Sequence, residues 1–507
     1  MIREDWRLAL LRRWRAEQIL SSQRMNPESQ QPRLLLIGLD SVPLPLLDEC
    51  CAQGLLPNLS RFRREGRTGL VTSDAATFPG SVWQTFFTMS DVSYHADYHL
   101  LYWDANRKRL RAPGRDKRQI TPFWHSLARD GVPVIAFDVP YSDTGRAPTG
   151  SIEVYDWAVH GATWSASYPN GLLRGLTRRH GASERRREPP EECPDDAIVG
   201  ELPGLVRDVA RRSAIIEDLA QSLEWRLLVT VYSETHRAGH WFWGVRGTGV
   251  PQGGVRRVLQ AFDERLPQLR ALLRPQDQIA VFSAHGMGPG FDMDRLVEAA
   301  VGYLTKAHGG AARRLPDPVK VLRDNLPPGL VRLITRTLPQ GLYNWAYPHL
   351  QNTRCDWRRE PWIINPLDSI VYVHANQRPW DGDAAEFSEG LEALASEFRG
   401  IKTVSGENVV EAVIRPAEVY DGPRLALLPD LVVLPARRPL GPELILADGS
   451  RRRVRRHSSR DGEHLPEGFY IQVGPGISAG SRGRTVPGEE LASLLCEPAG
   501  LHAQPMT

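Results

Sequence analysis

Short runs of apolar residues alternate with longer mixed stretches along most of this chain. Such runs predict buried β-strands, which we expect at residues 33–40, 133–140, 227–232, 279–282, 369–373, 431–434 and 469–473. Several of the stretches between them have helical character, and we expect helices at 45–53, 122–129, 193–223 and 329–337. Helices that alternate with apolar strands are typical of parallel strands joined by right-handed crossovers. The pattern therefore predicts an α/β fold with a mostly parallel central sheet flanked by helices.

Histidines stand next to three separate strand-like segments. His236 and His240 follow the strand at 227–232, His285 follows the strand at 279–282, and His464 precedes the strand at 469–473. The first two are spaced so that they can share one face of a helical turn and converge on one ion. A pair at this spacing is more often structural, but histidines at three strand ends lie where open α/β sheets place ligands. The pattern therefore predicts a metal site.

Two hydroxyl side chains, Thr77 and Ser81, lie just before a helix-like segment that runs to Thr88. Exposed backbone N–H groups at a helix start favour an anion, and a hydroxyl there can act as a nucleophile if a metal lowers its pKa. Ser81 can equally be a plain helix cap, and Asp40, which ends the first strand, can equally cap the helix that follows it.

The order of these motifs resembles that of a known group of enzymes. The ordered pieces are Gly38-Leu39-Asp40, Gly54-Leu55-Leu56-Pro57-Asn58-Leu59, Gly239-His240, His285-Gly286-Met287 and Gly462-Glu463-His464. They resemble the alkaline phosphatase superfamily, in particular its type I phosphodiesterase and nucleotide pyrophosphatase branch, from about Leu34 to Ile477. The resemblance implies an alkaline-phosphatase-like core and metal-dependent hydrolysis of phosphate esters through a Thr or Ser nucleophile.

The resemblance also implies a set of metal ligands. In that family two divalent ions, usually Zn²⁺, flank the nucleophile. Carried over by position, one ion is bound by His236, His240 and His464, and the other by Asp40, His285 and the nucleophile. Zn²⁺ is the expected cofactor, as one or two ions, with Mn²⁺ as the alternative.

Two departures from the family pattern affect these sites. His236 stands where the family has an aspartate, which produces a three-histidine site of the kind that suits zinc with an open position. Ala284 stands where the family has a second aspartate, so the other site loses a carboxylate. We expect that site to bind weakly unless Glu234 or Asp292 supplies an oxygen.

The nucleophile also departs from the pattern. Counting back from Trp83 and Thr88 places the expected hydroxyl at Pro79, which has none. Thr77 fits the Thr-Phe-Pro form if two residues are inserted after it, and Ser81 fits if the loop is shortened. We favour Thr77. His95 or His99 takes the place of a later histidine of the family pattern. The alternative is that each is a hydrogen-bonded histidine behind the ligands, which does not bind metal.

The 507 residues predict one large α/β core with an insertion. We expect an N-terminal tail at 1–31, the first part of the core at 32–306, a helical insertion at 307–360, the second part of the core at 361–480 and a C-terminal tail at 481–507. Met25 is an alternative start to Met1.

Composition bears on which partners the protein binds and on the cellular compartment in which it works. Lys and Arg (63) nearly balance Asp and Glu (60), which neither favours nor excludes nucleic acid, and we expect no nucleic-acid partner. No apolar run reaches the roughly 18 residues that span a bilayer, so we expect no membrane partner. The five cysteines are scattered and odd in number, which is typical of a reducing cytoplasm.

We therefore expect a metal-dependent hydrolase that acts on a small-molecule phosphate ester. One alternative is a sulfate or phosphonate ester hydrolase, or a group transferase in a biosynthetic pathway. A further alternative is a non-catalytic metal- or ligand-binding descendant, which Ala284 and the displaced hydroxyl favour.

Overall fold

The computed structural model describes residues 31–99, 101–104, 109–111, 120–158, 164–184, 194–291, 326–339, 341–342, 345–346, 362–367, 369–376, 384–441, 443–445, 449, 451–453 and 460–505. The predicted N-terminal tail and most of the predicted insertion at 307–360 lie outside these residues. Of the insertion, the described part includes helix α15 (Pro328–Thr337), where the sequence predicted a helix.

A ten-stranded sheet forms the centre of the fold, in the order β20-β2-β19-β9-β1-β8-β5-β6-β7, with β21 also paired to β2. Its strands are β1 (Leu34–Leu39), β2 (Arg67–Thr72), β5 (Val134–Phe137), β6 (Ser151–Tyr155), β7 (Ala166–Tyr168), β8 (Leu227–Tyr232), β9 (Gln278–Ser283), β19 (Glu467–Val473), β20 (Ser481–Arg482) and β21 (Val486–Pro487). The pairs of β1 with β8 and β9, and of β5 with β6 and β8, are parallel, whereas β19 runs antiparallel between β9 and β2. The predicted mostly parallel α/β sheet is confirmed.

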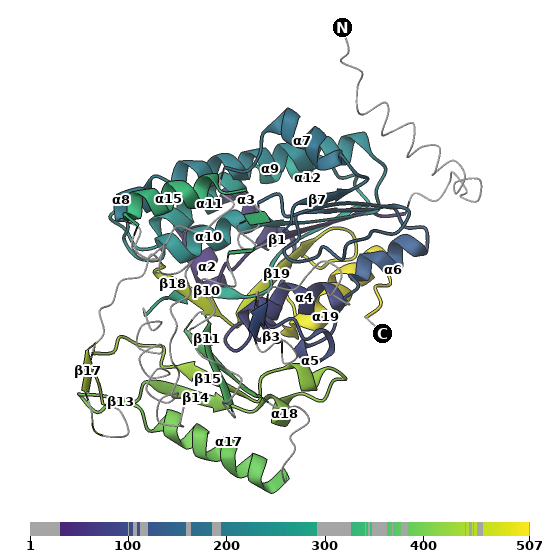
Figure 1. Cartoon of the computed structure of the whole chain (residues 1–507). Coiled ribbons are helices and arrows are strands. Elements are labelled where there is room, and N and C mark those ends of the chain that lie inside the picture. Colours follow the sequence, from purple (N-terminus) through teal and green to yellow (C-terminus); the bar gives the residue numbers. More distant parts are fainter. Residues whose placement is uncertain are drawn as a thin grey trace.

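Helices cover both faces of this sheet (Figure 1). Alternate residues of β1 enter two different apolar clusters: Leu35 and Ile37 pack on one face, and Leu34 and Leu36 on the other. The first face is covered by α2 (Leu44–Ala52), α3 (Pro57–Glu65), α9 (Leu202–Ser222), α11 (Gly253–Asp263) and α12 (Leu266–Arg270). The second face is covered by α4 (Val82–Thr88), α6 (Phe123–Arg129) and α19 (Gly488–Cys496). A strand buried on both faces reads as a continuous apolar run, which is why the sequence predicted β1, β5, β8, β9 and β19. The other strands of this sheet, β2, β6, β7, β20 and β21, were not predicted.

A second, four-stranded antiparallel sheet contains β11 (Trp362–Leu367), β12 (Ile370–Ala375), β15 (Leu431–Pro435) and β14 (Val410–Ile414), in that order. Helix α17 (Ala384–Arg399) packs on one face through Leu394 and Phe398. The other face contributes Tyr372 and Val432 to a cluster with Phe78 from the segment before α4. Two strands that the sequence assigned to the second part of the core thus belong to this separate sheet, which lies below the central one in Figure 1.

Residues that we predicted as a C-terminal tail form β20, β21 and α19. Leu491 and Leu495 of α19 are fully buried in the cluster that also holds α4 and α6. Among the described residues, no helix has the length and apolar character that crossing a membrane requires.

Candidate metal centre

The predicted ligands lie at the carboxyl ends of three neighbouring strands and on one short strand nearby. Asp40 directly follows β1, and α10 (Ser233–Phe242) begins directly after β8 and places His236 and His240 one turn apart. His285 follows β9 and precedes β10 (Gly286–Pro289), which pairs with β18 (Gly462–Leu465) so that Met287 lies opposite His464. Strand order therefore brings residues more than two hundred positions apart to one edge of the sheet.

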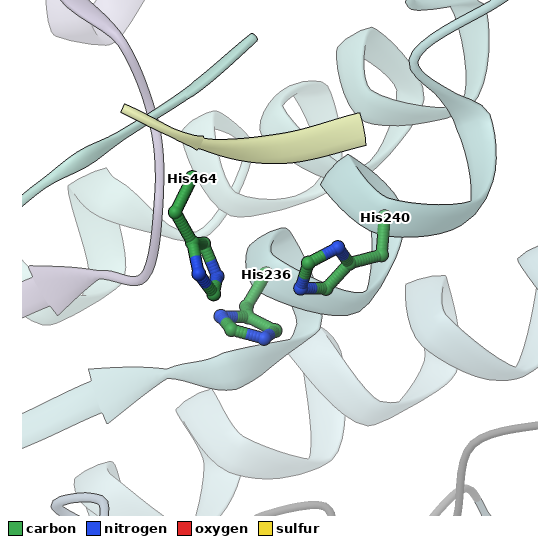
Figure 2. A group of neighbouring side chains, drawn as sticks. All are labelled: His236, His240 and His464. Carbon is green, nitrogen blue, oxygen red and sulfur yellow. The ribbon is translucent and has the colours of Figure 1, made fainter. Parts of the chain in front are cut away.

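The first group consists of His236, His240 and His464, whose ligand atoms all lie within 4.8 Å of one another. The rings converge from α10 and β18 (Figure 2), with centroids 4.6 to 5.0 Å apart. His240 Nδ1 lies 2.8 Å from the Gly462 carbonyl, so Nδ1–H donates to that oxygen and Nε2 carries the lone pair. Nε2 is buried and has no hydrogen-bond partner in the described structure. A buried imidazole lone pair facing two more imidazoles fits a zinc ion.

The second group consists of Asp40, His236 and His285, again with ligand atoms within 4.8 Å of one another. Asp40 Oδ2 lies 3.4 Å from His236 Nδ1, and Asp40 Oδ1 lies 3.9 Å from His285 Nε2. The indole N–H of Trp83 donates to Asp40 Oδ1 at 3.0 Å and fixes the carboxylate. His236 therefore belongs to both groups.

Ser41 is a polar residue at this centre that the sequence analysis did not identify. Its Oγ lies 2.9 Å from His236 Nδ1 and 2.8 Å from His285 Nε2. The available signal was its position directly after Asp40 at a strand end, which gives no indication of where the hydroxyl points.

Burial keeps two of these histidines neutral. Burial lowers the pKa of His240 well below its ordinary value, and the charge of Arg460 lowers it further. Burial also lowers the pKa of His285, although Asp40 opposes that shift. A neutral imidazole has a lone pair for a cation.

The two candidate nucleophiles, Thr77 and Ser81, differ in their surroundings. Ser81 is fully buried, and its Oγ donates to the Phe78 carbonyl at 2.8 Å. The carbonyl of Thr77 accepts a hydrogen bond from the Tyr372 hydroxyl at 3.1 Å. A small cavity of about 70 Å³ opens on the first group. Neither hydroxyl residue is among those that line it, which are Ala75, Ala76, Pro79, His240, Ser369, Ile370, Leu434, Pro435, Arg437, Arg460, Gly462, Glu463 and His464.

Of the two residues expected as replacement oxygen donors, Glu234 is not in the second group that the described residues form. Glu234 accepts hydrogen bonds from Arg212 at 3.0 Å through each of its oxygens, so it is held by an ion pair. Asp292 lies outside the described residues. Ala284 itself is buried in the apolar cluster that contains Trp83 and Phe282.

The two later histidines are engaged locally. His95 Nε2 lies 3.2 Å from Thr85 Oγ1, and its Nδ1 accepts from the Asp97 N–H at 3.1 Å. His99 Nδ1 accepts from the Leu101 N–H at 3.1 Å. Neither belongs to either ligand group among the described residues.

Residues 34–327 match the model of the type I phosphodiesterase / nucleotide pyrophosphatase family. The chain belongs to this family. A search of curated proteins found no match.

Solved structures share the fold. Phosphonoacetate hydrolase from Sinorhizobium meliloti 1021, in complex with phosphonoformate, superposes with a TM-score of 0.50 at 14% identity, covering 93% of this chain and 96% of that one. Human ectonucleotide pyrophosphatase / phosphodiesterase 5 superposes with a TM-score of 0.51 at 13% identity, covering 94% and 96%. At these identities the similarity concerns the fold.

Proposed function

We propose that this protein is a metal-dependent hydrolase of small-molecule phosphate esters that uses a threonine nucleophile. Family membership supports phosphoester chemistry. The observation that carries the metal dependence is the convergence of Asp40 and four histidines at the carboxyl ends of β1, β8 and β9 and on β18.

His236, His240 and His464 would bind the first ion, which we propose to be Zn²⁺. Such an ion polarises a phosphoryl oxygen and lowers the pKa of an oxygen nucleophile. Besides the metal ligands, the chain contributes positively charged side chains and a small cavity to substrate binding. Arg437 and Arg460 line the small cavity together with His240 and His464, and guanidinium groups bind phosphoryl groups through paired N–H donors. The limited volume of about 70 Å³ favours a group no larger than the phosphoryl end of the substrate.

Thr77 is the proposed nucleophile, in preference to Ser81. The buried Ser81 hydroxyl already donates to the Phe78 carbonyl. Thr77 lies in the loop whose neighbouring residues Ala75, Ala76 and Pro79 line the cavity.

The experiment is hydrolysis of an aryl phosphodiester, an aryl phosphomonoester, an aryl sulfate and an aryl phosphonate by zinc-loaded protein. We expect the phosphodiester to be cleaved fastest. Thr77→Ala should lower kcat by at least 100-fold and leave bound zinc unchanged, whereas Ser81→Ala should alter kcat less than threefold. A sulfate or phosphonate preference would replace the proposed substrate class, and equal effects of both variants would refute the nucleophile.

One observation favours a second candidate, a ligand-binding descendant without hydrolase activity. The loop before α4 contributes Ala75, Ala76 and Pro79 to the cavity beside His240, none of which has a hydroxyl, whereas the hydroxyl residue Ser369 comes from the turn between β11 and β12. Zinc-loaded protein that binds inorganic phosphate but hydrolyses none of the four esters would support that candidate.

We also propose that the protein works in the cytoplasm with reduced thiols. Cys50, Cys51 and Cys496 are free cysteines in the described structure, and two of them are buried. Disulfides in protein isolated under thiol-blocking conditions would overturn this proposal.

A further inference from the structure

Ser41 lies between the ligand groups in a backbone conformation that serine rarely adopts. The residue is 2% exposed and has φ of 63°, in the left-handed region that favours glycine. A non-glycine residue persists in that region when its surroundings compensate for the strain, as happens most often at functional sites. The contacts of the Ser41 hydroxyl are the interactions that can compensate for this backbone strain.

The Ser41 hydroxyl faces three ligand side chains at once. Its Oγ lies 2.8 Å from His285 Nε2, 2.9 Å from His236 Nδ1 and 3.4 Å from Asp40 Oδ1. A hydroxyl has one proton to donate, so it can donate to one of these three atoms at a time. Three potential donor atoms from three residues thus surround the buried Ser41 hydroxyl.

The spacing of these donors matches a coordination shell. Ligands about 2.0–2.1 Å from a tetrahedral zinc ion lie about 3.3 Å from one another. The distances between a carboxylate oxygen of Asp40 and the two imidazoles are 3.4 and 3.9 Å, and those from Ser41 Oγ are 2.8, 2.9 and 3.4 Å. Each of the five distances lies within about 0.6 Å of that edge, the two Ser41–histidine contacts being shorter and the Asp40 distances divided between its two carboxylate oxygens.

We infer that the Ser41 hydroxyl is a ligand of a second divalent ion, bound together with Asp40, His236 and His285. Because a neutral imidazole has one lone pair, His236 would give up its ring proton to bind both ions, one through each ring nitrogen. The serine oxygen then supplies the donor that a carboxylate at Ala284 does not. Asp40 is held for this role by Trp83, whose N–H donates to Oδ1. The inference rests on the metal dependence in the proposed function. It adds that a second ion binds and that Ser41 is one of its ligands.

The position of Ser41 assigns it to the metal and not to attack on substrate. It is 2% exposed and does not line the cavity that opens on His240 and His464. Ser41 is therefore a binding residue for the ion, and Thr77 keeps the proposed role of nucleophile.

The test measures Co²⁺ binding by wild type, Ser41→Ala and Ser41→Gly. Titration calorimetry gives the number of ions and their affinities, and visible absorption reports the coordination of Co²⁺. Both variants remove Oγ, but glycine also relieves the strained φ, so Ser41→Gly separates a folding defect from a missing ligand. Wild type should bind two ions. Both variants should keep the three-histidine ion and bind the second at least tenfold more weakly, about 1.4 kcal/mol.

Ser283→Ala is the matched control. Ser283 is also a fully buried serine next to the centre, but its Oγ contacts backbone groups alone, accepting from the Val42 N–H at 2.9 Å and donating to the His285 carbonyl at 2.7 Å. This variant should bind two ions. Ser41→Cys gives a positive signature, because a thiolate bound to Co²⁺ adds a charge-transfer band in the near ultraviolet.

Two results would overturn the inference: a second ion bound equally by wild type and Ser41→Gly, or one ion in wild type. If wild type holds one ion at His236, His240 and His464 and hydrolyses phosphodiester, the proposed function stands and the Ser41 inference fails. If wild type binds no Co²⁺ or Zn²⁺ at all, both fail.

Discussion

A buried arginine holds the helix that carries two of the proposed metal ligands, His236 and His240. Arg212 of α9 is fully buried, and its Nη2 donates to Asp138 Oδ2 at 2.8 Å and to Glu234 Oε1 at 3.0 Å. Burial opposes the charge, but Glu234 and Asp138 outweigh it and raise the pKa of Arg212 above its ordinary value. The guanidinium also lies 5.2 to 5.6 Å from the ring centroids of Phe137, Trp157 and Tyr232. Glu234 stands in the first turn of α10, two residues before His236.

Arg212→Met should therefore destabilise the fold and the metal centre together. The substitution leaves the buried Asp138 carboxylate without this cation and leaves Glu234 with the longer 3.7 Å pair to the buried Arg237, and breaking a buried pair in this way costs about 3–5 kcal/mol. Because Glu234 lies in the first turn of α10, zinc affinity at His236 and His240 should fall at least tenfold, about 1.4 kcal/mol. Neutralising Asp138 as well, in Arg212→Met/Asp138→Asn, should recover part of the loss, because residues in one network are not additive and Glu234 keeps its pair with Arg237.

The assay is urea unfolding followed by circular dichroism, with zinc affinity measured on the same preparations. Arg211→Met is the control, since the neighbouring Arg211 is 30% exposed and pairs with Glu184 at 2.8 Å, and a partly exposed pair contributes about 0–1 kcal/mol. A loss for Arg212→Met no larger than that for Arg211→Met would refute the reasoning.

Three further predictions follow from single residues. Ala284→Asp should restore the second ion to Ser41→Gly, detected by metal analysis of the double variant, and failure to restore it would show that a carboxylate there does not reach the site. Burial lowers the pKa of His95 to about 3, below its unfolded value near 6.5. The folded state thus resists protonation, and this stabilisation is complete above pH 6.5 and lost as the pH falls toward 3. Between pH 7.5 and 5 wild type should lose about 2 kcal/mol that His95→Gln does not lose, measured by urea midpoints, and equal losses would contradict this. Burial raises the pKa of the Cys496 thiol to about 12, so a thiol reagent should modify the partly exposed Cys51 before Cys496 in native protein, and labelling of Cys496 ahead of Cys51 would contradict the packing of α19.

The side chains of the candidate metal centre could be predicted because their signals are local. Asp40 and His285 each follow an apolar strand buried on both faces, and the spacing of His236 and His240 fits one helical turn. The assignment of the first ion to His236, His240 and His464 came from the family resemblance, and the structure brings these three side chains together.

Other features depend on packing that no local pattern expresses. The strands at 370–375 and 431–435 were predictable as strands, but an apolar run does not say which sheet it joins. The proposed role of Ser41 as a metal ligand involves a backbone with positive φ, a conformation that the residue type does not indicate. Helix α19 is nine residues long and follows a polar, glycine-rich segment, so its buried leucines gave too short a pattern to distinguish it from a tail.

The central claim is a divalent ion bound by histidines at the carboxyl end of the sheet. The most direct measurement is an anomalous difference map at the zinc absorption edge, from crystals of zinc-loaded protein. The account predicts one peak within bonding distance of His236, His240 and His464, which is lost in His240→Ala, and a second peak beside Asp40 and Ser41. A map without a peak at the three histidines, or a peak that persists in His240→Ala at full height, would contradict the account.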